Sequence, residues 1–307
     1  MLLRDLIQEH QHQLALLIGN GINRYNSRAN TNSWDALLST LAKSSLPELN
    51  GKLPEGISLT EFYDVLELAS RRPLKNSQTS KKLPSLQQQF CQLMADWKPA
   101  VQHQSITRWA RHFACPILTT NFEHTLSESV QAPAFVTSKN AFTDFYPWET
   151  YFSNSKLDHP CGGFGIWHIN GMQKYHRSIR LGLTHYMGSV ERARARLHKG
   201  SKRLSAGGAI NDWEGANTWL QILFHKPLLI IGLNLAENEV FLRWLLIERA
   251  KYHKDFPDRA QAAWYVHTQH EQDLGKLYFL KAVGVDSFCV PDYSSIYDAS
   301  TWRLEAD

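Results

Sequence analysis

Cysteine is scarce in this sequence, and its placement excludes several classes of protein. The 307 residues contain four cysteines, which lie far apart and form no CxxC pair: Cys91, Cys115, Cys161 and Cys289. Zinc ribbons and disulfide frameworks need paired or closely spaced cysteines. We therefore predict a protein without a bound metal and without disulfides, which fits a reducing cytoplasm.

Long apolar runs and a strong charge of one sign are also missing. No apolar run approaches the ~18 residues that span a bilayer, and the N-terminal segment MLLRDLIQEHQHQ lacks the apolar stretch of a signal peptide. The net charge of +4, from 33 basic and 29 acidic residues, is too small for a dedicated nucleic-acid-binding protein. We expect a cytoplasmic protein that does not bind membranes and does not bind nucleic acid directly.

The composition is otherwise that of a globular protein, with 43% hydrophobic and 20% charged residues. Aromatic residues make up 11%, an excess that often serves ligand pockets or subunit interfaces. The densest basic cluster runs from Arg192 to Arg203. We interpret it as the solvated face of a helix and the loop after it, and contact with an acidic partner is the alternative.

Short apolar segments alternate with amphipathic ones along the chain. Between the apolar segments, hydrophobic residues recur at three-to-four spacing, as in FYDVLELAS after a capping box from Ser58 to Glu61. Strands that alternate with helices form βαβ units. We predict an α/β fold with a Rossmann-like parallel sheet of about six strands and helices on both faces. The predicted strands are Leu14–Ile18, Cys115–Thr119, Phe164–Ile169, Pro227–Leu233, Ala262–His267 and Asp286–Val290.

Two segments are too long to be simple connections. The chain between the turn at Gly19 and the strand at Cys115 has helical periodicity and is far longer than one crossover needs. We predict a single domain over residues 1–307, with a helical insertion after the first strand at about residues 33–112. The stretch from Lys139 to Gly163 shows little periodicity, and we expect a long loop that covers a site.

Glycines follow the first predicted strand. Gly19-Asn20-Gly21 has the residues of a nucleotide-binding turn, in which backbone N–H groups approach a pyrophosphate. An ordinary tight turn is an equally good interpretation. Arg24 stands where the dehydrogenase fingerprint has its third glycine, which argues against a hydride-transferring enzyme.

Polar residues follow three later predicted strands, at the sheet edge where open α/β folds bind ligands. Asn121 comes just after the second strand. His168 and Asn170 share one face of the third, about 6 to 7 Å apart, and a structural role for His168 is the alternative. Asn234 follows Gly232 after the fourth, where a helix N-cap is the alternative.

These strand ends, in this order, resemble the sirtuin-like NADase family of bacterial anti-phage defence, a sirtuin-like Rossmann domain without a zinc ribbon. The resemblance runs over nearly the whole chain. Its most specific part is ILTTNFEHTLSE, in which Asn121 matches the catalytic asparagine of the family. The family's glycine turn, the Trp-containing helix downstream and the later nucleotide-contacting segment match Gly19, Gly21 and Asn23, SWDALL from Ser33 to Leu38, and Gly232, Asn234 and Leu235.

The resemblance implies an NAD hydrolase that cleaves the nicotinamide–ribose bond and gives nicotinamide and ADP-ribose, with NAD as substrate and no metal. It also implies a regulated NAD-depleting effector of anti-phage defence. The CxxC pairs and the Phe-Arg pair of protein-deacylating sirtuins are missing, which disfavours a deacylase. As partners we expect a second copy of the chain, a separately encoded sensor protein, or both.

One position departs from the family pattern. The family has histidine immediately before a glycine where this sequence has Asn170-Gly171. His168 lies one pleat repeat away, and we predict that it is the base, because imidazole accepts protons near neutral pH. His176 and His185 follow in the connected segment. The alternative is a catalytically inactive regulatory subunit that binds NAD or ADP-ribose.

Residue chemistry and the resemblance together give each position a role. Asn121 orients a water or a ribose hydroxyl, because an amide both donates and accepts hydrogen bonds. The backbone from Gly19 to Ile22 holds the pyrophosphate, and Arg24 pairs with phosphate. Glu239 either binds ribose or only favours the helix dipole. The predicted nucleotide-binding residues are Gly19, Asn20, Gly21, Ile22, Asn23, Arg24, Thr120, Asn170, Gly232, Asn234 and Glu239.

Overall fold

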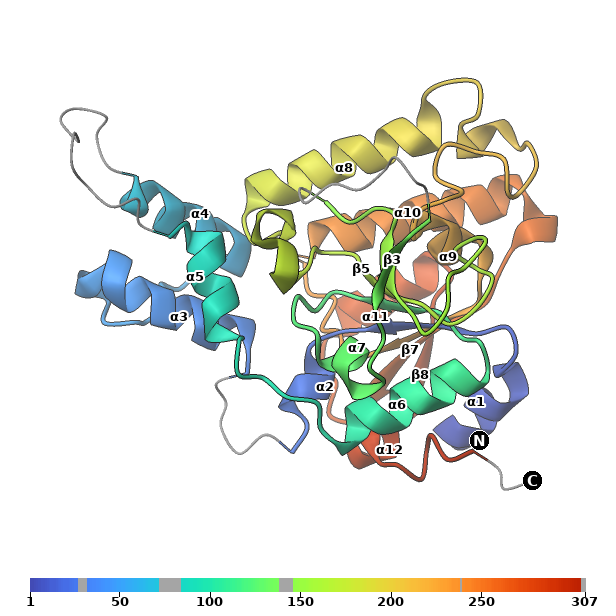
Figure 1. Cartoon of the computed structure of the whole chain (residues 1–307), viewed down its shortest axis with the longest axis horizontal. Coiled ribbons are helices and arrows are strands. Elements are labelled where there is room, and N and C mark those ends of the chain that lie inside the picture. The colour runs from blue at the N-terminus through green and yellow to red at the C-terminus, as the bar shows by residue number, and fades with distance from the viewer. Residues whose placement is uncertain (27–31, 72–83, 138–145, 238, 305–307) are drawn as a thin grey trace.

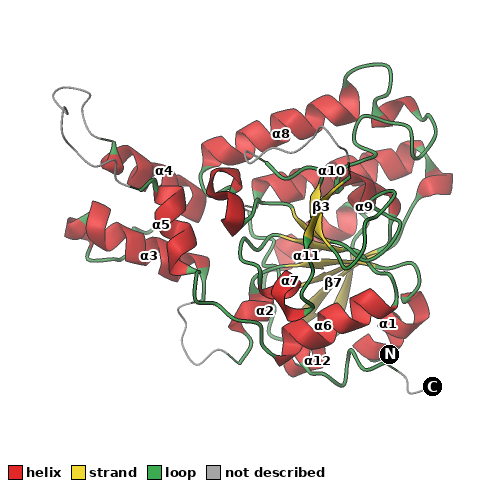
Figure 2. Ribbon diagram, in the orientation of Figure 1, coloured by secondary structure: helices red, strands yellow, loops and turns green. Residues whose placement is uncertain are grey.

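The computed structural model of the chain describes residues 1–26, 32–71, 84–137, 146–237 and 239–304. Its centre is a sheet of eight strands in the order β3-β4-β5-β2-β1-β6-β7-β8, and helices surround this sheet (Figure 1, Figure 2). The strands from β5 to β8 in that order are parallel, whereas β3 and β4 pair antiparallel. The protein therefore has an α/β fold with a mixed sheet.

Every predicted strand is present, and the sheet has two more. The predicted ones are β1 Ala15–Ile18, β2 Ile117–Thr119, β5 Ile166–His168, β6 Leu228–Ile231, β7 Ala263–Thr268 and β8 Asp286–Val290. The additional strands are β3 Ala134–Val136 and β4 Thr150–Phe152. The predicted α/β fold is confirmed, but the sheet is mixed and has eight strands where we predict a parallel sheet of about six. Three residues are too few for an alternating pattern to be recognised. β4 interrupts the predicted loop, of which positions 139–145 lie outside the described residues.

The two faces of the sheet bury different side chains, because successive residues of a strand point to opposite sides. On one face, Leu17 and Leu118 share a core cluster with residues of the helices that follow β5, β6 and β7. On the other face, Leu16 and Ile117 share a cluster with residues of the first helix and of the helices around β2. Burial on both faces explains why the central strands are continuous apolar runs in the sequence.

The helices differ widely in length. Among the described residues, no helix is both long enough and apolar enough to cross a membrane. The helices are α1 Leu3–His10, α2 Gly21–Arg24, α3 Trp34–Ser45, α4 Leu59–Ser70, α5 Leu86–Leu93, α6 Val101–His112, α7 Thr125–Ser129, α8 Leu183–His198, α9 Leu220–His225, α10 Val240–Asp255, α11 Leu274–Ala282 and α12 Ser294–Tyr297. Short 3-10 turns lie at Pro47–Leu49, Gln173–Ser178, Leu204–Ala206 and Pro257–Arg259.

Helices α3, α4 and α5 stand to one side of the sheet (Figure 1) and form a third core cluster together with Ile179 and Leu181 of the segment before α8. α4 begins at the predicted capping box, where the Glu61 N–H donates to Ser58 Oγ (3.2 Å) and the Ser58 N–H donates to Glu61 Oε2 (2.9 Å). α6 was predicted as part of the insertion at 33–112. It packs on the sheet through Ile106 and Trp109, whereas α3, α4 and α5 belong to the other cluster.

The turns after β1 and β6 touch through glycines. The Gly21 N–H donates to the Gly232 carbonyl (2.9 Å). A Cβ on Gly21 would lie 2.6 Å from the Gly232 Cα, and a Cβ on Gly232, whose φ is +67°, would lie 2.4 Å from Tyr297 Oη. No side chain fits at either position. Packing between the two turns therefore requires glycine whether or not a ligand binds.

We predict that Gly21→Ala and Gly232→Ala each lower the free energy of unfolding by about 1–3 kcal/mol, because the added methyl group overlaps backbone or Tyr297. Gly188→Ala is the matched control. A Cβ at Gly188 of α8 meets nothing within 4 Å. In a helix interior alanine is more stable than glycine by about 1 kcal/mol, so Gly188→Ala should not destabilise the protein. Urea unfolding measures all three, and equal effects at the three sites would contradict the packing argument.

Candidate functional site

A cavity of about 640 Å³ opens at the carboxyl ends of the parallel strands. Its wall contains residues that follow β1, β2, β5, β6 and β7. β1 lies between β2 and β6, where the strand order reverses, and open α/β sheets bind ligands at this place. The structure brings these predicted site residues together on the wall: Asn20, Gly21, Arg24, Thr120, Asn121, Asn170, Gly232, Asn234 and Glu239.

Four predicted site residues are not part of the cavity wall. Gly19 packs against the turn after β6, where a Cβ would lie 2.5 Å from the Gly232 carbonyl oxygen. Ile22 is fully buried in the core below the turn. Asn23 is buried in a polar network, and His168 is fully buried in β5. These residues support the wall from behind, and none of the four belongs to the lining.

His168 is held as a neutral imidazole beneath Asn121. Its Nδ1 donates to the Asn121 carbonyl (2.8 Å), because a carbonyl only accepts. Nε2 therefore carries the lone pair, and it has no hydrogen-bond partner among the described residues. The ring contacts His124 and Phe152 edge-on, and burial lowers the pKa of His168 to about 4. His168 thus fixes the Asn121 backbone, and it lies outside the lining of the cavity in which we expected it to act as the base.

Asn121 lies at the cavity wall with an unpaired oxygen. Its side chain and backbone are 4% exposed. The backbone N–H donates to Thr119 Oγ1 (3.1 Å), and Nδ2 lies 3.5 Å from the Gly19 carbonyl oxygen. Oδ1 has no hydrogen-bond partner among the described residues. A buried acceptor without a partner costs free energy, so a water or hydroxyl group that donates to Asn121 Oδ1 would be held firmly there.

A buried polar network links α6 to the cavity behind Asn121. His103 Nδ1 accepts from a backbone N–H at the start of α6, so Nε2 carries the proton and donates to Asn23 Oδ1 (3.0 Å). Asn23 Nδ2 donates to Glu123 Oε1 (2.9 Å), which also accepts from Thr125 Oγ1 (2.9 Å). Burial raises the pKa of Glu123, and these hydrogen bonds oppose the rise. Glu123 lines the cavity, and sequence reasoning missed it although it lies two positions after Asn121.

Asn170, Tyr186 and Glu239 form another part of the wall. Asn170 Nδ2 donates to Tyr186 Oη (3.4 Å). Burial and the charge of Glu239 raise the pKa of the Tyr186 phenol. Burial also raises the pKa of Glu239 to about 7, although Glu239 precedes α10, whose dipole favours a carboxylate. Sequence reasoning missed Tyr186, because a tyrosine on an amphipathic helix carries no signal of its own.

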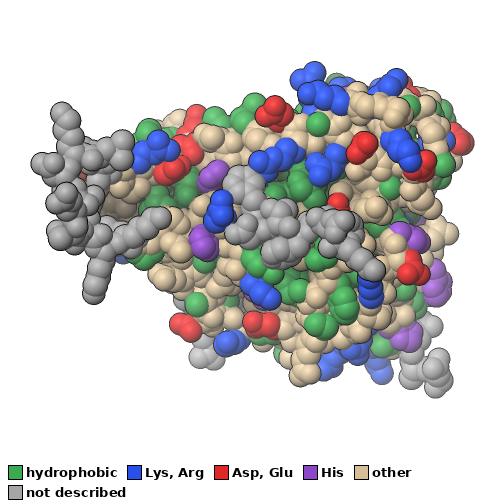
Figure 3. All heavy atoms as spheres, turned by 45° about the horizontal axis from the view of Figure 1, so that its top comes forward, with side chains coloured by type: hydrophobic (Ala, Val, Ile, Leu, Met, Phe, Trp, Pro, Cys, Tyr) green, Lys and Arg blue, Asp and Glu red, His purple; other side chains and the backbone are tan. Residues whose placement is uncertain are grey.

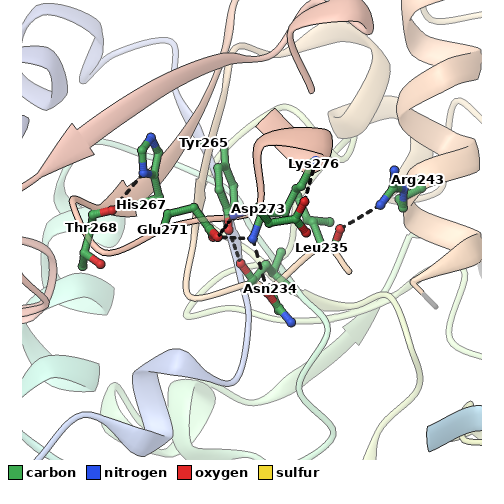
Figure 4. A network of polar contacts seen from close by, with 10 residues as sticks. Asn234, Leu235, Arg243, Tyr265, His267, Thr268, Glu271, Asp273 and Lys276 are labelled. Carbon is green, nitrogen blue, oxygen red and sulfur yellow. Dashed lines mark hydrogen bonds and ion pairs between the residues drawn. The ribbon is translucent and has the colours of Figure 1, made fainter. Parts of the chain in front are cut away.

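An ion pair closes the β7 end of the cavity (Figure 4). The Lys276 ammonium donates to the Glu271 carboxylate and to Asn234 Oδ1 (3.3 Å), and it lies 5.5 Å from the centroid of the Tyr265 ring. The Asp273 N–H donates to Glu271 Oε1 (3.0 Å). Burial acts to raise the pKa of Glu271, but the hydrogen bond and charge of Lys276 bring it below its usual value. No sequence pattern marks this pair, because a loop brings the two residues together.

The helices α3 to α5 supply the side of the cavity opposite the strand ends. Their contribution is largely aromatic and apolar. Ser33 caps α3 by accepting from the Ala36 N–H (3.4 Å), and this cap places the following tryptophan at the wall. Ligand pockets commonly combine an apolar wall with a few polar groups. The residues are Trp34, Leu37, Leu59, Phe90, Met94 and, in the segment after α5, Trp97.

The basic cluster lies outside the cavity, on α8 and the loop after it. Arg192, Arg194 and Lys199 are exposed. Figure 3 shows Lys and Arg side chains interspersed with acidic ones on this side of the molecule. Lys202 pairs with Asp212 at 2.5 Å. This arrangement agrees with a solvated helix face and loop.

Comparison of the sequence with protein-family models and with curated proteins gives no match. Among the described residues, no three His, Cys, Asp or Glu side chains gather into a group that could hold a metal ion. The family resemblance and the expectation of no bound metal therefore stay predictions.

We predict that acid destabilises the fold through its buried histidines. Burial lowers the pKa of His103 and of His168 to about 4, whereas the unfolded chain has a value near 6.5. The unfolded state therefore binds more protons, and the free energy of unfolding falls as the pH drops from about 6.5 toward 4. Urea unfolding across this range should show a smaller fall for His103→Gln. The exposed His12→Gln is the control, and identical slopes for the two variants would refute the prediction.

A second prediction concerns the ion pair. The Lys276 side chain is 1% exposed and that of Glu271 is 19% exposed. Glu271→Gln leaves a deeply buried cation, which costs about 3–5 kcal/mol, whereas Lys276→Met leaves a carboxylate that water reaches and costs less. The double variant should recover part of the loss. Urea midpoints measure the order, and a greater loss for Lys276→Met would contradict it.

Proposed function

We propose that the chain is an NAD hydrolase that cleaves the nicotinamide–ribose bond. The observation that carries this proposal is the convergence of separate strand-end motifs in one cavity, with the unpaired Asn121 Oδ1 at its wall. The six parallel strands, numbered by their order in the chain, run 3-2-1-4-5-6, which is the order of dinucleotide-binding Rossmann folds. The cavity volume also falls in the usual range of ligand pockets.

The proposed reaction makes few acid–base demands on the protein. Nicotinamide is bound to ribose as a cationic pyridinium and leaves neutral, so no general acid is needed. The transition state resembles an oxocarbenium ion, as in glycoside hydrolysis. The protein must position the ribose, bury the leaving group and direct a water at the anomeric carbon.

Asn121 and its supports serve these tasks. The Asn121 amide holds a water or a ribose hydroxyl through Oδ1, while His168 and Thr119 fix its backbone. The Glu123 carboxyl group beside it is buried, which raises its pKa, and in its charged form it would stabilise the oxocarbenium ion. The aromatic wall of α3 to α5 offers a surface on which a pyridinium ring can stack.

The other arm of the dinucleotide extends along the strand ends. The turn at Asn20 and Gly21, with Arg24 at the wall, suits the pyrophosphate. Asn234 and the compensated pair of Glu271 and Lys276 suit the adenosine half, because amide and carboxylate oxygens accept from ribose hydroxyls. The place of the enzyme as a regulated effector of anti-phage defence, with self-association or a separate sensor, rests on the motif resemblance.

A second candidate function is an inactive subunit that binds NAD or ADP-ribose. The observation in its favour is the position of the histidine, because His168 is outside the cavity and Asn170 stands on the wall instead. An amide has no useful basicity near neutral pH. Binding without cleavage is the outcome that this candidate requires.

We predict that purified protein releases nicotinamide from NAD and that Asn121→Ala lowers the rate at least ~10²-fold, the usual loss for one preorganised polar contact to the reacting groups. The fold should persist, since the truncation leaves the apolar core intact. Chromatography of free nicotinamide measures the rate, and thermal melting checks the fold.

The exposed Asn154, whose Nδ2 donates to the Val130 carbonyl, supplies the control. Asn154→Ala should keep the wild-type rate. Wild-type turnover in Asn121→Ala would refute the assignment of Asn121. Calorimetric binding of NAD by a wild-type protein that releases no nicotinamide, alone or with its neighbouring gene products, would establish the binding subunit instead.

A further inference from the structure

The carboxylates on the cavity wall differ in what they contact. They are Asp35, Glu123, Glu239 and Glu271. Asp35 is exposed, Glu123 accepts from two side chains, and Glu271 is bonded to Lys276. Glu239 is half-buried, and its carboxylate has no hydrogen-bond or ion-pair partner among the described residues. It is therefore the sheltered carboxylate whose oxygens stay available to a ligand.

The histidine side chains of this region are less well placed than Glu239 to act on a group held by Asn121. His168 is excluded from the cavity by its bond to the Asn121 carbonyl. His267 and His270 do line the cavity, but His267 lies in β7 and His270 just after it, and β7 lies three strands from β2 in the sheet. At about 4.8 Å between neighbouring strands, that separation is roughly 14 Å, one strand farther from Asn121 than the segment after β6 that carries Glu239.

Glu239 is connected to the nicotinamide half of the cavity through Tyr186. Tyr186 Oη accepts from Asn170 Nδ2, and its phenol is near enough to Glu239 for the charge of that carboxylate to act on it. Asn170 follows β5, which pairs with the strand that ends before Asn121. Asn121, Asn170 and Glu239 therefore all line the cavity, and Tyr186 stands between Asn170 and Glu239.

We propose that Glu239 is the general base of the NAD hydrolysis proposed above, and this inference rests on that function. The water held by Asn121 forms a bond from its oxygen to the anomeric carbon of the nicotinamide ribose. The carbon–nitrogen bond breaks, and its electron pair goes to the ring nitrogen, so nicotinamide leaves neutral. The proton of the water passes to the Glu239 carboxylate, which later returns it to solvent.

The surroundings of Glu239 suit a base that works near neutral pH. The charged and titratable groups on the elements around it are Tyr186 of α8, Arg180 in the segment before α8, Arg243 of α10 and, elsewhere on the wall, Glu123. None of them forms an ion pair with Glu239, and burial alone raises its pKa to about 7. A base acts when ionised, so the rate should rise with pH through about 7.

The test measures nicotinamide release from NAD by the purified full chain between about pH 5 and 9. Glu239→Gln should lower kcat by ~10² to 10⁴ with KM nearly unchanged, and it should lose the rise of rate with pH. Glu239→Asp should keep part of the rate and the rise. Added formate should raise the rate of Glu239→Ala, which a merely structural role would not produce. Glu237→Gln, at an exposed glutamate two residues earlier, should match wild type.

The outcomes separate this inference from the function on which it rests. An active wild type with an equally active Glu239→Gln variant would overturn the base and leave the hydrolase standing. A raised KM with unchanged kcat would make Glu239 a ribose-binding residue and also overturn the base. NAD binding without nicotinamide release by wild type at any pH would overturn both.

Discussion

The close contact between the turns after β1 and β6 sets the geometry of everything around the cavity. Gly21 and Gly232 bring two backbones together where no side chain fits. Both glycines line the cavity and offer only main chain there, so its chemistry comes from side chains on neighbouring strand ends and helices. The same contact fixes β1 beside β6 at the reversal of strand order. The glycines that look like a ligand signature in the sequence are thus required first by packing, and a pyrophosphate would use a turn that already exists.

A second constraint acts on polar groups behind the wall. Burying an amide, an imidazole and a carboxylate together is tolerated only when their donors and acceptors match. The backbone N–H at the start of α6 donates to His103 Nδ1 and so fixes its tautomer. His103 then donates to Asn23, and Asn23 donates to Glu123, so every donor in this network meets an acceptor. The Asn23 amide therefore forms its hydrogen bonds within the network and is not available to bind a ligand. Through His103, α6 thus determines the hydrogen bonds around Glu123. This polar network, like the apolar contacts of α6, ties the helix to the sheet.

Patterning predicted the strands that are buried on both faces, and glycines and amides after those strands predicted the cavity. Sequence patterning did not identify residues whose surroundings come from distant parts of the chain. The surroundings of Glu123 depend on α6, and those of Tyr186 depend on Asn170 and on Glu239 before α10. For His168, alternation placed it beside Asn170, but β5 ends at His168 and the chain then turns at Gly171, whose φ is +96°. The alternation of a strand does not extend past its last residue, so the two side chains separate.

Because His168 lies outside the cavity lining, two carboxyl groups on the wall are the candidates for acid–base chemistry in the proposed reaction. Glu123 and Glu239 line the same cavity, but donors surround one and burial alone acts on the other. Hydrogen bonds to a carboxylate favour its charged form, and burial disfavours it. Paired carboxyl groups in unlike surroundings commonly divide two tasks between them. In the reaction proposed above, the hydrogen bonds to Glu123 oppose the rise of pKa that its burial causes, whereas Glu239 has no such donors and is suited to take up and release a proton. Such a division needs no imidazole, so an asparagine at position 170 is compatible with catalysis.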